Sequence, residues 1–288
     1  MSINSEYLHP LFVAEYEEAD LQGALSPTEV RDVEHQMDKK AVLVFRGQPL
    51  DQDQQIAFAR NFGQLEGGFI KVNQRPSRFK YAELADISNV SVDGKVADRE
   101  ARESVGNFAN NQLWHSDSSF QQAAARYSML SASVLPPLGG DTEFWDIHAT
   151  NLGGRDDLPR ELQGLRAERY LQNSRFILGD TDYSESQRNA MPPVSWPLVR
   201  THAGSGRKFL FIGAHAGHIE GRPVAEGRML LAELLEHATQ RKFVYRHRWK
   251  VGDLVMWDNR CVLHRGRGYD ITARRELRRA TTVDDGVV

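Results

Sequence analysis

The sequence contains a single cysteine, no long run of hydrophobic residues and no strong excess of charge. Cys261 alone excludes an internal disulfide framework and cysteine-rich zinc or iron–sulfur sites, and it suits a reducing compartment. No apolar run approaches the roughly 20 residues that a membrane-spanning helix needs. Residues 1–6 have neither the basic start nor the apolar stretch of a signal peptide. We therefore expect a soluble cytoplasmic protein with no membrane association.

Two further classes of function lack support in the sequence. The formal net charge of −3 gives no bulk attraction to nucleic acid, so we expect no nucleic-acid partner. No Gly-x-Gly-x-x-Gly follows a predicted strand and there is no phosphate-binding loop, which argues against nucleotide chemistry. The chain of 288 residues is long enough for a substantial core. We expect residues 1–288 to form one domain.

The N-terminal part reads as a helix followed by a strand. Ser26-Pro27-Thr28-Glu29 has the form of a capping box with proline at the first helical position, and predicts a helix up to Lys40. A buried strand follows over residues 41–45. Hydrophobic residues at helical spacing predict three further helices, at about residues 53–62, 158–170 and 224–238.

Short extended segments dominate the rest of the chain. Residues 71–111 are polar and aperiodic, which is typical of a lid or binding loop, with short strands near residues 81–87. Further strands are predicted at residues 127–132, 142–145, 208–212, 243–249, 254–257, 262–265 and 274–283. Short strands separated by Gly, Pro and Asp turns indicate an antiparallel sandwich or jelly roll and not a parallel sheet. We expect a mostly β fold with flanking helices.

The stretch from Leu113 to Phe120 contains a candidate metal-binding pair. In an extended strand the side chains of residues i and i+2 point the same way, so His115 and Asp117 would converge while Ser116 faces away. One such pair is expected by chance in a chain with ten histidines, so a third ligand is needed. His264, after a predicted strand and the turn-like residues 258–260, is the best candidate.

Two histidines and one carboxylate on one face of a metal leave three coordination positions open. This arrangement is typical of mononuclear non-haem Fe(II) oxygenases, in which a cosubstrate and O2 occupy the open positions. A surface pair of His115 and Asp117 is the alternative interpretation. His202, His237 and His247 are most simply structural or surface residues, and Cys261 is most simply a small buried strand residue.

Several motifs carry a resemblance to a known family. They are His115-x-Asp117, Gly139-Gly140-Asp141-Thr142, and Trp257-Asp258-Asn259-Arg260 leading to His264 and Arg275. They resemble the taurine dioxygenase family of Fe(II)/2-oxoglutarate enzymes, over nearly the whole chain. Longer stretches at residues 51–60, 69–74 and 274–282 are most similar to the aryloxyacetate-cleaving members of that family.

The resemblance implies a double-stranded β-helix (jelly-roll, cupin-like) core. It also implies Fe(II) held by His115, Asp117 and His264, with 2-oxoglutarate and O2 as cosubstrates. The distal carboxylate of 2-oxoglutarate would meet Arg275 and Thr142. A guanidinium suits a carboxylate because it can bond both oxygens at once.

The arginines near the C-terminus support this interpretation. In a strand over residues 274–282, Arg275, Leu277 and Arg279 share one face, while Arg274, Glu276 and Arg278 share the other. Two arginines pointing into a barrel are costly to bury without anions, and two carboxylates would supply them. A solvated basic face or a nucleic-acid patch is the alternative, and we expect the outward set to be solvated.

By resemblance, Arg279 takes the substrate carboxylate, with Lys71 and the backbone amide of Ser119 as helpers. Lys95 and His215 are weaker candidates for contacts with the ether oxygen and the aryl group. Lys71 could instead be a plain surface lysine, and His215 and His218 could be ordinary polar residues.

The resemblance implies a dioxygenase that cleaves aryloxyacetates, with 2,4-dichlorophenoxyacetate as the preferred substrate. We also expect a homo-oligomer. A sibling enzyme that oxidises a sulfonate, such as taurine, or another aryloxyalkanoate stays open, because Arg279 could bind either anion. A metal-binding jelly-roll module or a zinc hydrolase also stays open, although a hydrolase has no use for Arg275 and Thr142 as a 2-oxoglutarate clamp.

Overall fold

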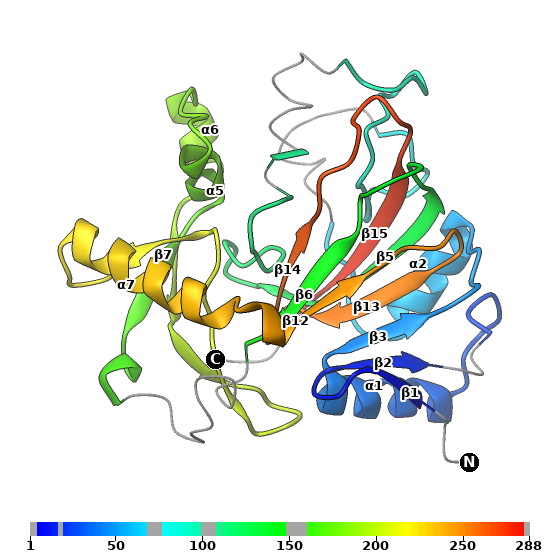
Figure 1. The fold of residues 1–288 in the computed structure, drawn as a ribbon, viewed down its shortest axis with the longest axis horizontal. Coiled ribbons are helices and arrows are strands. Elements are labelled where there is room, and N and C mark those ends of the chain that lie inside the picture. The colour runs from blue at the N-terminus through cyan, green and yellow to red at the C-terminus, as the bar shows by residue number, and fades with distance from the viewer. Residues whose placement is uncertain are drawn as a thin grey trace.

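The computed structural model describes residues 5–16, 20–67, 77–98, 108–109, 111–147 and 160–284. In these residues the strands form a seven-stranded sheet, two three-stranded sheets and a two-stranded sheet (Figure 1). The large sheet has the order β1 (Ser5–His9), β2 (Val13–Tyr16), β3 (Val42–Phe45), β13 (Leu254–Asp258), β5 (Ala125–Val134), β15 (Glu276–Val283) and β4 (Leu84–Asp86).

A smaller sheet faces the large one and completes the jelly roll. It has the order β12 (Val244–His247), β6 (Thr142–Asp146) and β14 (Val262–Gly266), and all its pairs are antiparallel. Phe144 of this sheet contacts Trp257 of the large one, with ring centroids 5.5 Å apart. The two sheets do not close into a continuous barrel. The predicted mostly β jelly roll with flanking helices is therefore confirmed.

Strand β13 shows how the large sheet is buried on both faces. Leu254 and Met256 point to one face and Val255 and Trp257 to the other, as the period of two requires. Helices α1 (Pro27–Lys40) and α2 (Gln52–Arg60) cover the first face, and the small sheet covers the second. The second face is therefore the interior of the jelly roll.

The two covering helices begin at capping residues that the sequence contains. Ser26 caps α1 in the predicted capping box, with Glu29 donating its backbone N–H to the serine hydroxyl. Asp51 caps α2 in the same way, through Gln54. The bounds of both helices agree with the prediction to within two residues.

A separate group of elements extends from the jelly roll on the side of α7 in Figure 1. Its strands are β7 (Arg166–Arg169), β8 (Val194–Pro197), β9 (Val199–Thr201), β10 (Lys208–Leu210) and β11 (Ala216–Ile219). Its helices are α5 (Leu171–Ile177), α6 (Glu185–Asn189) and α7 (Val224–Ala238), with 3-10 turns at Arg160–Leu162 and Arg241–Phe243. Helix α7 packs on β11 and has the bounds that the sequence predicts.

The predicted helix at 158–170 is wrong in its described part. Residues 160–162 form a 3-10 turn, and residues 166–169 form β7, the central strand between β8 and β11. In β7 the buried residues Ala167 and Arg169 alternate with more exposed ones. Residues 166–169 form a strand because they pair with two strands distant in sequence. The pattern of such a short polar segment fits the period of a helix as well as that of a strand.

The opening of the chain also differs from the prediction. Strands β1 and β2 precede α1, and β2 runs parallel to β3, which lies directly after that helix. The sheet is thus antiparallel except at this pair. Within the predicted region 71–111, the described residues 77–98 include one strand, β4, which lies inside the predicted strand segment at residues 81–87. Residues 71–76 and 99–107 of that region lie outside the described residues.

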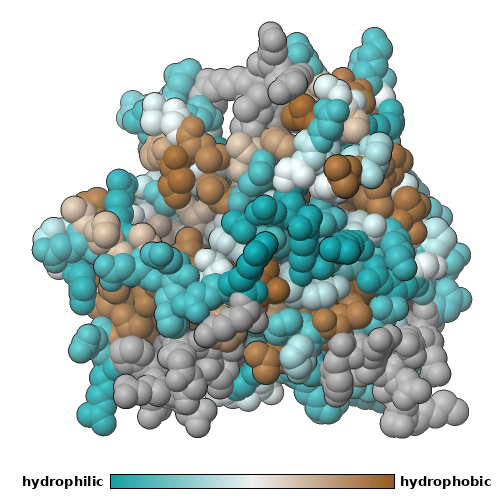
Figure 2. Space-filling model, viewed as in Figure 1, coloured by the Kyte–Doolittle hydropathy of each residue, from teal (hydrophilic) through white to brown (hydrophobic). Residues whose placement is uncertain are grey.

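The face of the molecule in Figure 2 is mainly hydrophilic, with hydrophobic residues in separate areas. None of the described helices combines the length and the hydrophobicity required to span a bilayer.

Candidate metal centre and arginine sites

Two histidines far apart in the sequence lie side by side at the outer edge of the small sheet, where His264 of β14 pairs with His115. His115 and His264 exchange both backbone hydrogen bonds, at 3.0 and 2.9 Å, in an isolated antiparallel bridge. Residues paired in this way project their side chains to the same face. The imidazole centroids are accordingly 4.2 Å apart.

Asp117 joins the two imidazoles through the expected alternation. Its Oδ1 lies 3.9 Å from His115 Nε2 and 3.6 Å from His264 Nε2. Ser116, between the two, turns away and donates its hydroxyl to the Val262 carbonyl. The three side chains offer one donor atom each, all within 4.8 Å of one another, and all three residues are buried.

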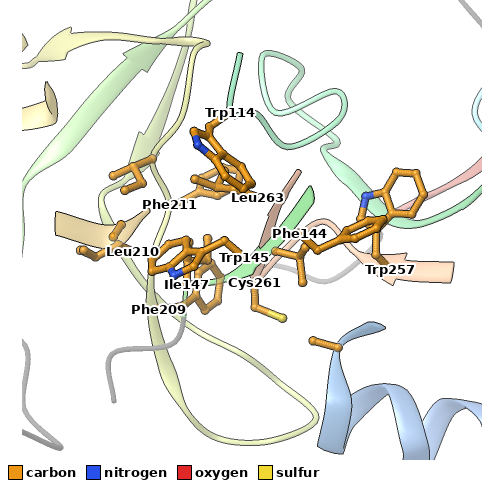
Figure 3. Close-up of a cluster of buried hydrophobic side chains, with 14 of the residues drawn as sticks. Trp114, Phe144, Trp145, Ile147, Phe209, Leu210, Phe211, Trp257, Cys261 and Leu263 are labelled. Carbon is orange, nitrogen blue, oxygen red and sulfur yellow. The ribbon is translucent and has the colours of Figure 1, made fainter. Parts of the chain in front are cut away.

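The opposite faces of the same strands anchor the site in the core. Trp114 and Leu263, which precede the two histidines, belong to the main hydrophobic cluster (Figure 3). Trp257 packs on the other side of His264, with ring centroids 4.6 Å apart. Large buried residues therefore hold both histidines in place.

The protonation of the site suits metal binding. His115 Nδ1 lies 2.7 Å from the Leu113 carbonyl, which can only accept, so Nδ1 carries the proton and Nε2 keeps its lone pair. Burial lowers the pKa of both His115 and His264, so both imidazoles are neutral at pH 7. Burial alone would raise the pKa of Asp117, but the positive charge of Arg279 is the main cause that lowers it to about 2.

Two polar residues position Asp117. Ser128 on β5 donates to its Oδ2 at 2.7 Å, and Asn259 donates to the Ser128 hydroxyl at 2.9 Å. The side-chain oxygen of Asn259 also accepts from the Asp117 backbone N–H at 3.0 Å. Oδ2 is thus occupied by a hydrogen bond and Oδ1 is directed to the histidines. Neither residue was predicted to be part of the site, although Asn259 lies in one of the motifs that carry the family resemblance.

Arg279 lies directly beside this carboxylate. One of its terminal nitrogens donates to Asp117 Oδ1 in a short ion pair, and its buried Nε has no hydrogen-bond partner among the described residues. Arg279, Leu277 and Arg275 point into the jelly roll, as the alternation predicts. Arg278 points to the other face, where it donates to Gln55 of α2 at 2.7 Å. The prediction that the outward arginines are solvated is therefore wrong for Arg278, because α2 covers it.

Arg275 is a buried cation whose neighbours are mainly carbonyl groups. Its terminal nitrogens donate to the carbonyls of Ile87 and Gly140, at 3.2 and 3.1 Å, and its buried Nε is unpartnered within the described residues. Gly140 has φ +74°, and a Cβ there would lie 3.1 Å from the Arg275 Nε. Buried charges are normally paired, so this arrangement suits an anionic ligand.

Thr142 follows the Gly140 turn at the start of β6 and is buried. The indole N–H of Trp249 donates to its hydroxyl oxygen at 3.0 Å. Since an indole N–H can only donate, the hydroxyl proton of Thr142 stays available for an acceptor such as a carboxylate.

Ser119 and His215 are also close to the candidate metal centre. The Ser119 hydroxyl lies 3.2 Å from His215 Nδ1, and Arg169 donates to the same hydroxyl at 3.2 Å. His215 packs edge-on against His115, with centroids 6.0 Å apart. Arg169 is fully buried, and burial lowers its pKa to about 9. Arg169 was not predicted as a site residue, because a single arginine in a polar segment has no distinctive sequence pattern.

The structure does not place either of the two lysines predicted to contact the substrate in the buried site. Lys71 lies outside the described residues. Lys95 lies on a surface turn, with its side chain 82% exposed and its ammonium 3.5 Å from Asp93. The structure thus gives Lys95 no contact with the buried site residues.

A second buried cluster, His202, Asp258 and Cys261, also has ligand-type atoms close together. Its carboxylate is occupied by other partners, because Arg260 and His202 form hydrogen bonds to Asp258 at 2.6 and 3.0 Å. Burial would raise the pKa of Asp258, yet Arg260 and His202 hold it well below the usual range. Burial raises the pKa of the Cys261 thiol, which keeps it protonated. This cluster is an internal ion pair of the fold.

The cluster of His115, Asp117 and His264 has the chemical properties that a metal site requires. Its neutral imidazoles and ionised carboxylate form the two-histidine, one-carboxylate donor set of non-haem Fe(II) oxygenases. That donor set lies on a jelly roll with a buried arginine, Arg275, whose Nε has no partner within the described residues. This combination is typical of oxygenases that use an anionic cosubstrate.

Comparisons with known proteins agree with this class. Residues 4–281 match the family described as taurine catabolism dioxygenase TauD, TfdA family. The chain belongs to this family.

Two curated relatives are very similar to this chain. An alpha-ketoglutarate-dependent 2,4-dichlorophenoxyacetate dioxygenase of Burkholderia sp. (strain RASC) is 84% identical over 98% of this chain and 95% of that protein. The protein of the same name from Cupriavidus pinatubonensis is 80% identical over 100% of both chains. Among solved structures, AAD-2 in complex with Mn(II) and N-oxalylglycine has a TM-score of 0.92 and 44% identity, over 99% of this chain and 98% of that chain.

Proposed function

We propose that this protein is an Fe(II)- and 2-oxoglutarate-dependent dioxygenase that cleaves the ether of aryloxyacetates. Its preferred substrate is 2,4-dichlorophenoxyacetate, which yields 2,4-dichlorophenol and glyoxylate, with succinate and CO2 from the cosubstrate. The convergence of His115, Asp117 and His264 beside two inward-facing arginines carries this proposal. The identity of 80–84% to two enzymes with this activity supports the substrate.

His115, Asp117 and His264 hold the metal. When bound, Fe(II) with 2-oxoglutarate and O2 supplies the oxidation of the carbon between the ether oxygen and the carboxylate of the substrate. The resulting hemiacetal breaks down without a protein nucleophile. The chain itself contributes neutral imidazoles, an oriented carboxylate and a buried environment.

Two arginines bind the two carboxylates. Arg275, with Thr142, takes the distal carboxylate of 2-oxoglutarate, since its Nε is unpartnered within the described residues and the Thr142 hydroxyl can donate. Arg279 takes the substrate carboxylate, with the backbone amide of Ser119 and Lys71 as helpers. His215 contacts the ether oxygen or the aryl group. The exposed position of Lys95 argues against a contact between its ammonium group and the substrate.

The same geometry serves a sibling enzyme acting on taurine or another alkylsulfonate, because a guanidinium binds either anion. A jelly roll with zinc and hydrolytic activity is disfavoured by Arg275, since hydrolysis needs no second anion site.

Substrate-dependent formation of succinate across a panel of aryloxyacetates, aryloxypropanoates and taurine tests the proposal. We expect succinate and phenol in equal amounts with 2,4-dichlorophenoxyacetate and little turnover of taurine. A preference for taurine would identify the sibling activity. Absence of succinate with every compound, with Fe(II) present, would contradict the oxygenase proposal.

We further propose that residues 1–288 act as one domain in a cytoplasmic homo-oligomer, with no nucleic-acid or membrane partner. Size-exclusion chromatography with light scattering tests the oligomer, and a monomeric mass would contradict it.

A further inference from the structure

A chain of hydrogen bonds runs from a buried arginine to the edge of the metal centre, through Arg169, Ser119 and His215. Arg169 donates to the Ser119 hydroxyl, and that hydroxyl lies 3.2 Å from His215 Nδ1. All three residues are buried. His215 is a proposed substrate contact, whereas Arg169 and the Ser119 hydroxyl have no role in the proposed function.

Arg169 is held rigidly. It also donates to the carbonyls of Phe211 and Ile212, at 2.7 and 3.1 Å, and its guanidinium stacks 4.0 Å from the centroid of the Phe211 ring. Each of these acceptors is uncharged. The guanidinium therefore has a fixed position and one terminal nitrogen directed at Ser119.

The backbone that carries His215 is equally well fixed. Ala214 N–H donates to the Trp114 carbonyl at 2.8 Å, next to the proposed ligand His115. Tyr170 N–H donates to the His215 carbonyl at 3.1 Å, directly after Arg169 in the chain. The imidazole thus has a defined position relative to the metal centre, and only its proton placement is left to specify.

The donors and acceptors determine that placement. A guanidinium can only donate, so Ser119 Oγ accepts from Arg169. The Ser119 hydroxyl must then donate its own proton, and His215 Nδ1 is the remaining partner within hydrogen-bond distance in the described residues. If His215 Nδ1 carried a proton instead, the fully buried hydroxyl proton of Ser119 would have no acceptor there. His215 Nδ1 is therefore unprotonated, and Nε2 carries the proton.

We propose that Arg169 and Ser119 are positioning residues that hold His215 as the Nε2–H tautomer, so that it can only donate a hydrogen bond to the substrate. Its Nε2 makes no hydrogen bond within the described residues. This inference rests on the proposed function and deepens it. The site selects compounds with an acceptor atom next to the reacting carbon, as the ether oxygen of an aryloxyacetate is, over compounds with a methylene or an N–H group there.

The tautomer of His215 can be measured without turnover. The full chain, free of metal and labelled with 15N-histidine, is studied by long-range 1H–15N NMR at pH 7.5, with the His215 signals assigned by their loss in His215→Gln. We expect a proton on Nε2 and none on Nδ1 in the wild type, and a mixture of tautomers in Ser119→Ala. A proton on Nδ1 in the wild type would overturn the proposal.

A matched control separates this role from general packing. Arg200 is a half-buried arginine over the same Phe211 ring, at 5.0 Å, but it pairs with Asp284. We expect Arg169→Lys to disturb the tautomer of His215 and Arg200→Lys to leave it unchanged. Equal effects of the two variants would indicate a structural role only. If Arg169→Lys does not fold, Ser119→Ala alone decides.

Substrate preference gives an independent measurement on the iron-loaded enzyme. The ratio of kcat/KM for phenoxyacetate to that for 3-phenylpropanoate, in which a methylene replaces the ether oxygen, is measured by succinate formation. We expect the ratio to fall about tenfold in Ser119→Ala, the equivalent of one hydrogen bond, and to stay constant in Arg200→Lys. An unchanged ratio in Ser119→Ala would overturn the proposal. Lack of turnover with both compounds would contradict the proposed function, while the NMR result would still decide the tautomer.

Discussion

Replacing Ser128 by alanine is expected to weaken Fe(II) binding although Ser128 is not one of the proposed metal ligands. Its hydroxyl donates to Asp117 Oδ2 at 2.7 Å and accepts from Asn259 at 2.9 Å. Ser128→Ala leaves one carboxylate oxygen and one amide N–H without these partners in a fully buried setting. Asp117 is then free to rotate and present either oxygen to the histidines.

The magnitude follows from the type of bond lost. A hydrogen bond to a charged group contributes about 1.5–3 kcal/mol. Loss of a residue that orients a metal ligand typically weakens metal binding about 10- to 100-fold, which corresponds to roughly 1.4–2.7 kcal/mol. The two estimates agree, so we expect the Kd for Fe(II) to rise about 10- to 100-fold.

Anaerobic isothermal titration of the metal-free chain with Fe(II) measures this change. Ser131→Ala is the matched control, because Ser131 is a buried serine on the same strand whose side chain points to the helix-covered face. We expect its Kd to equal that of the wild type. Thermal unfolding of both variants shows whether the apo fold is intact. An unchanged Kd in Ser128→Ala, or equal weakening in both variants, would refute the reasoning.

Further predictions concern the arginines and the histidines. Arg275→Met should raise the KM for 2-oxoglutarate at least about 30-fold, because the buried carboxylate of the cosubstrate loses its counter-ion. Arg274→Met, at an exposed position, should leave this KM unchanged, and steady-state kinetics measures both variants. Arg279→Gln should raise the KM for the aryloxyacetate and leave Fe(II) affinity equal or tighter, because a cation beside Asp117 is removed; much weaker Fe(II) binding by titration would contradict this. The buried histidines of the centre have lowered pKa values, so the unfolded chain takes up protons first as pH falls. The free energy of unfolding of the metal-free chain should therefore fall below about pH 6.5, by up to ~1.4 kcal/mol per histidine per pH unit. Urea unfolding between about pH 5 and 7.5 measures this, and a flat profile would count against neutral buried imidazoles.

Local patterns explain which parts of the structure were predictable. The capping box at Ser26, the leucine-rich face of α7 and the alternation of Arg275 with Arg279 each depend on residues within a few positions. The approach of His115 to Asp117 has the same origin, since it follows from strand geometry alone. Such features are predictable because the interactions that produce them involve only residues close together in the sequence.

Features that depend on distant partners were missed. The strand at residues 166–169 exists because β8 and β11 flank it, and no local period shows this. Likewise, Asn259 and Ser128 come within hydrogen-bond distance of Asp117 only when β5 and β13 pair. Arg278 is covered by α2, and its partner Gln55 lies more than 200 positions away in the sequence. Side-chain networks of this kind require the three-dimensional fold.

The central claim is that two imidazoles and one carboxylate bind one Fe(II) ion and leave room for 2-oxoglutarate. Its most direct test is the visible absorption spectrum of the anaerobic protein with one equivalent of Fe(II), before and after 2-oxoglutarate is added. The account predicts that 2-oxoglutarate produces a charge-transfer band in the wild type and that His264→Ala does not form it. A wild-type protein that binds Fe(II) but stays colourless with 2-oxoglutarate would contradict the claim.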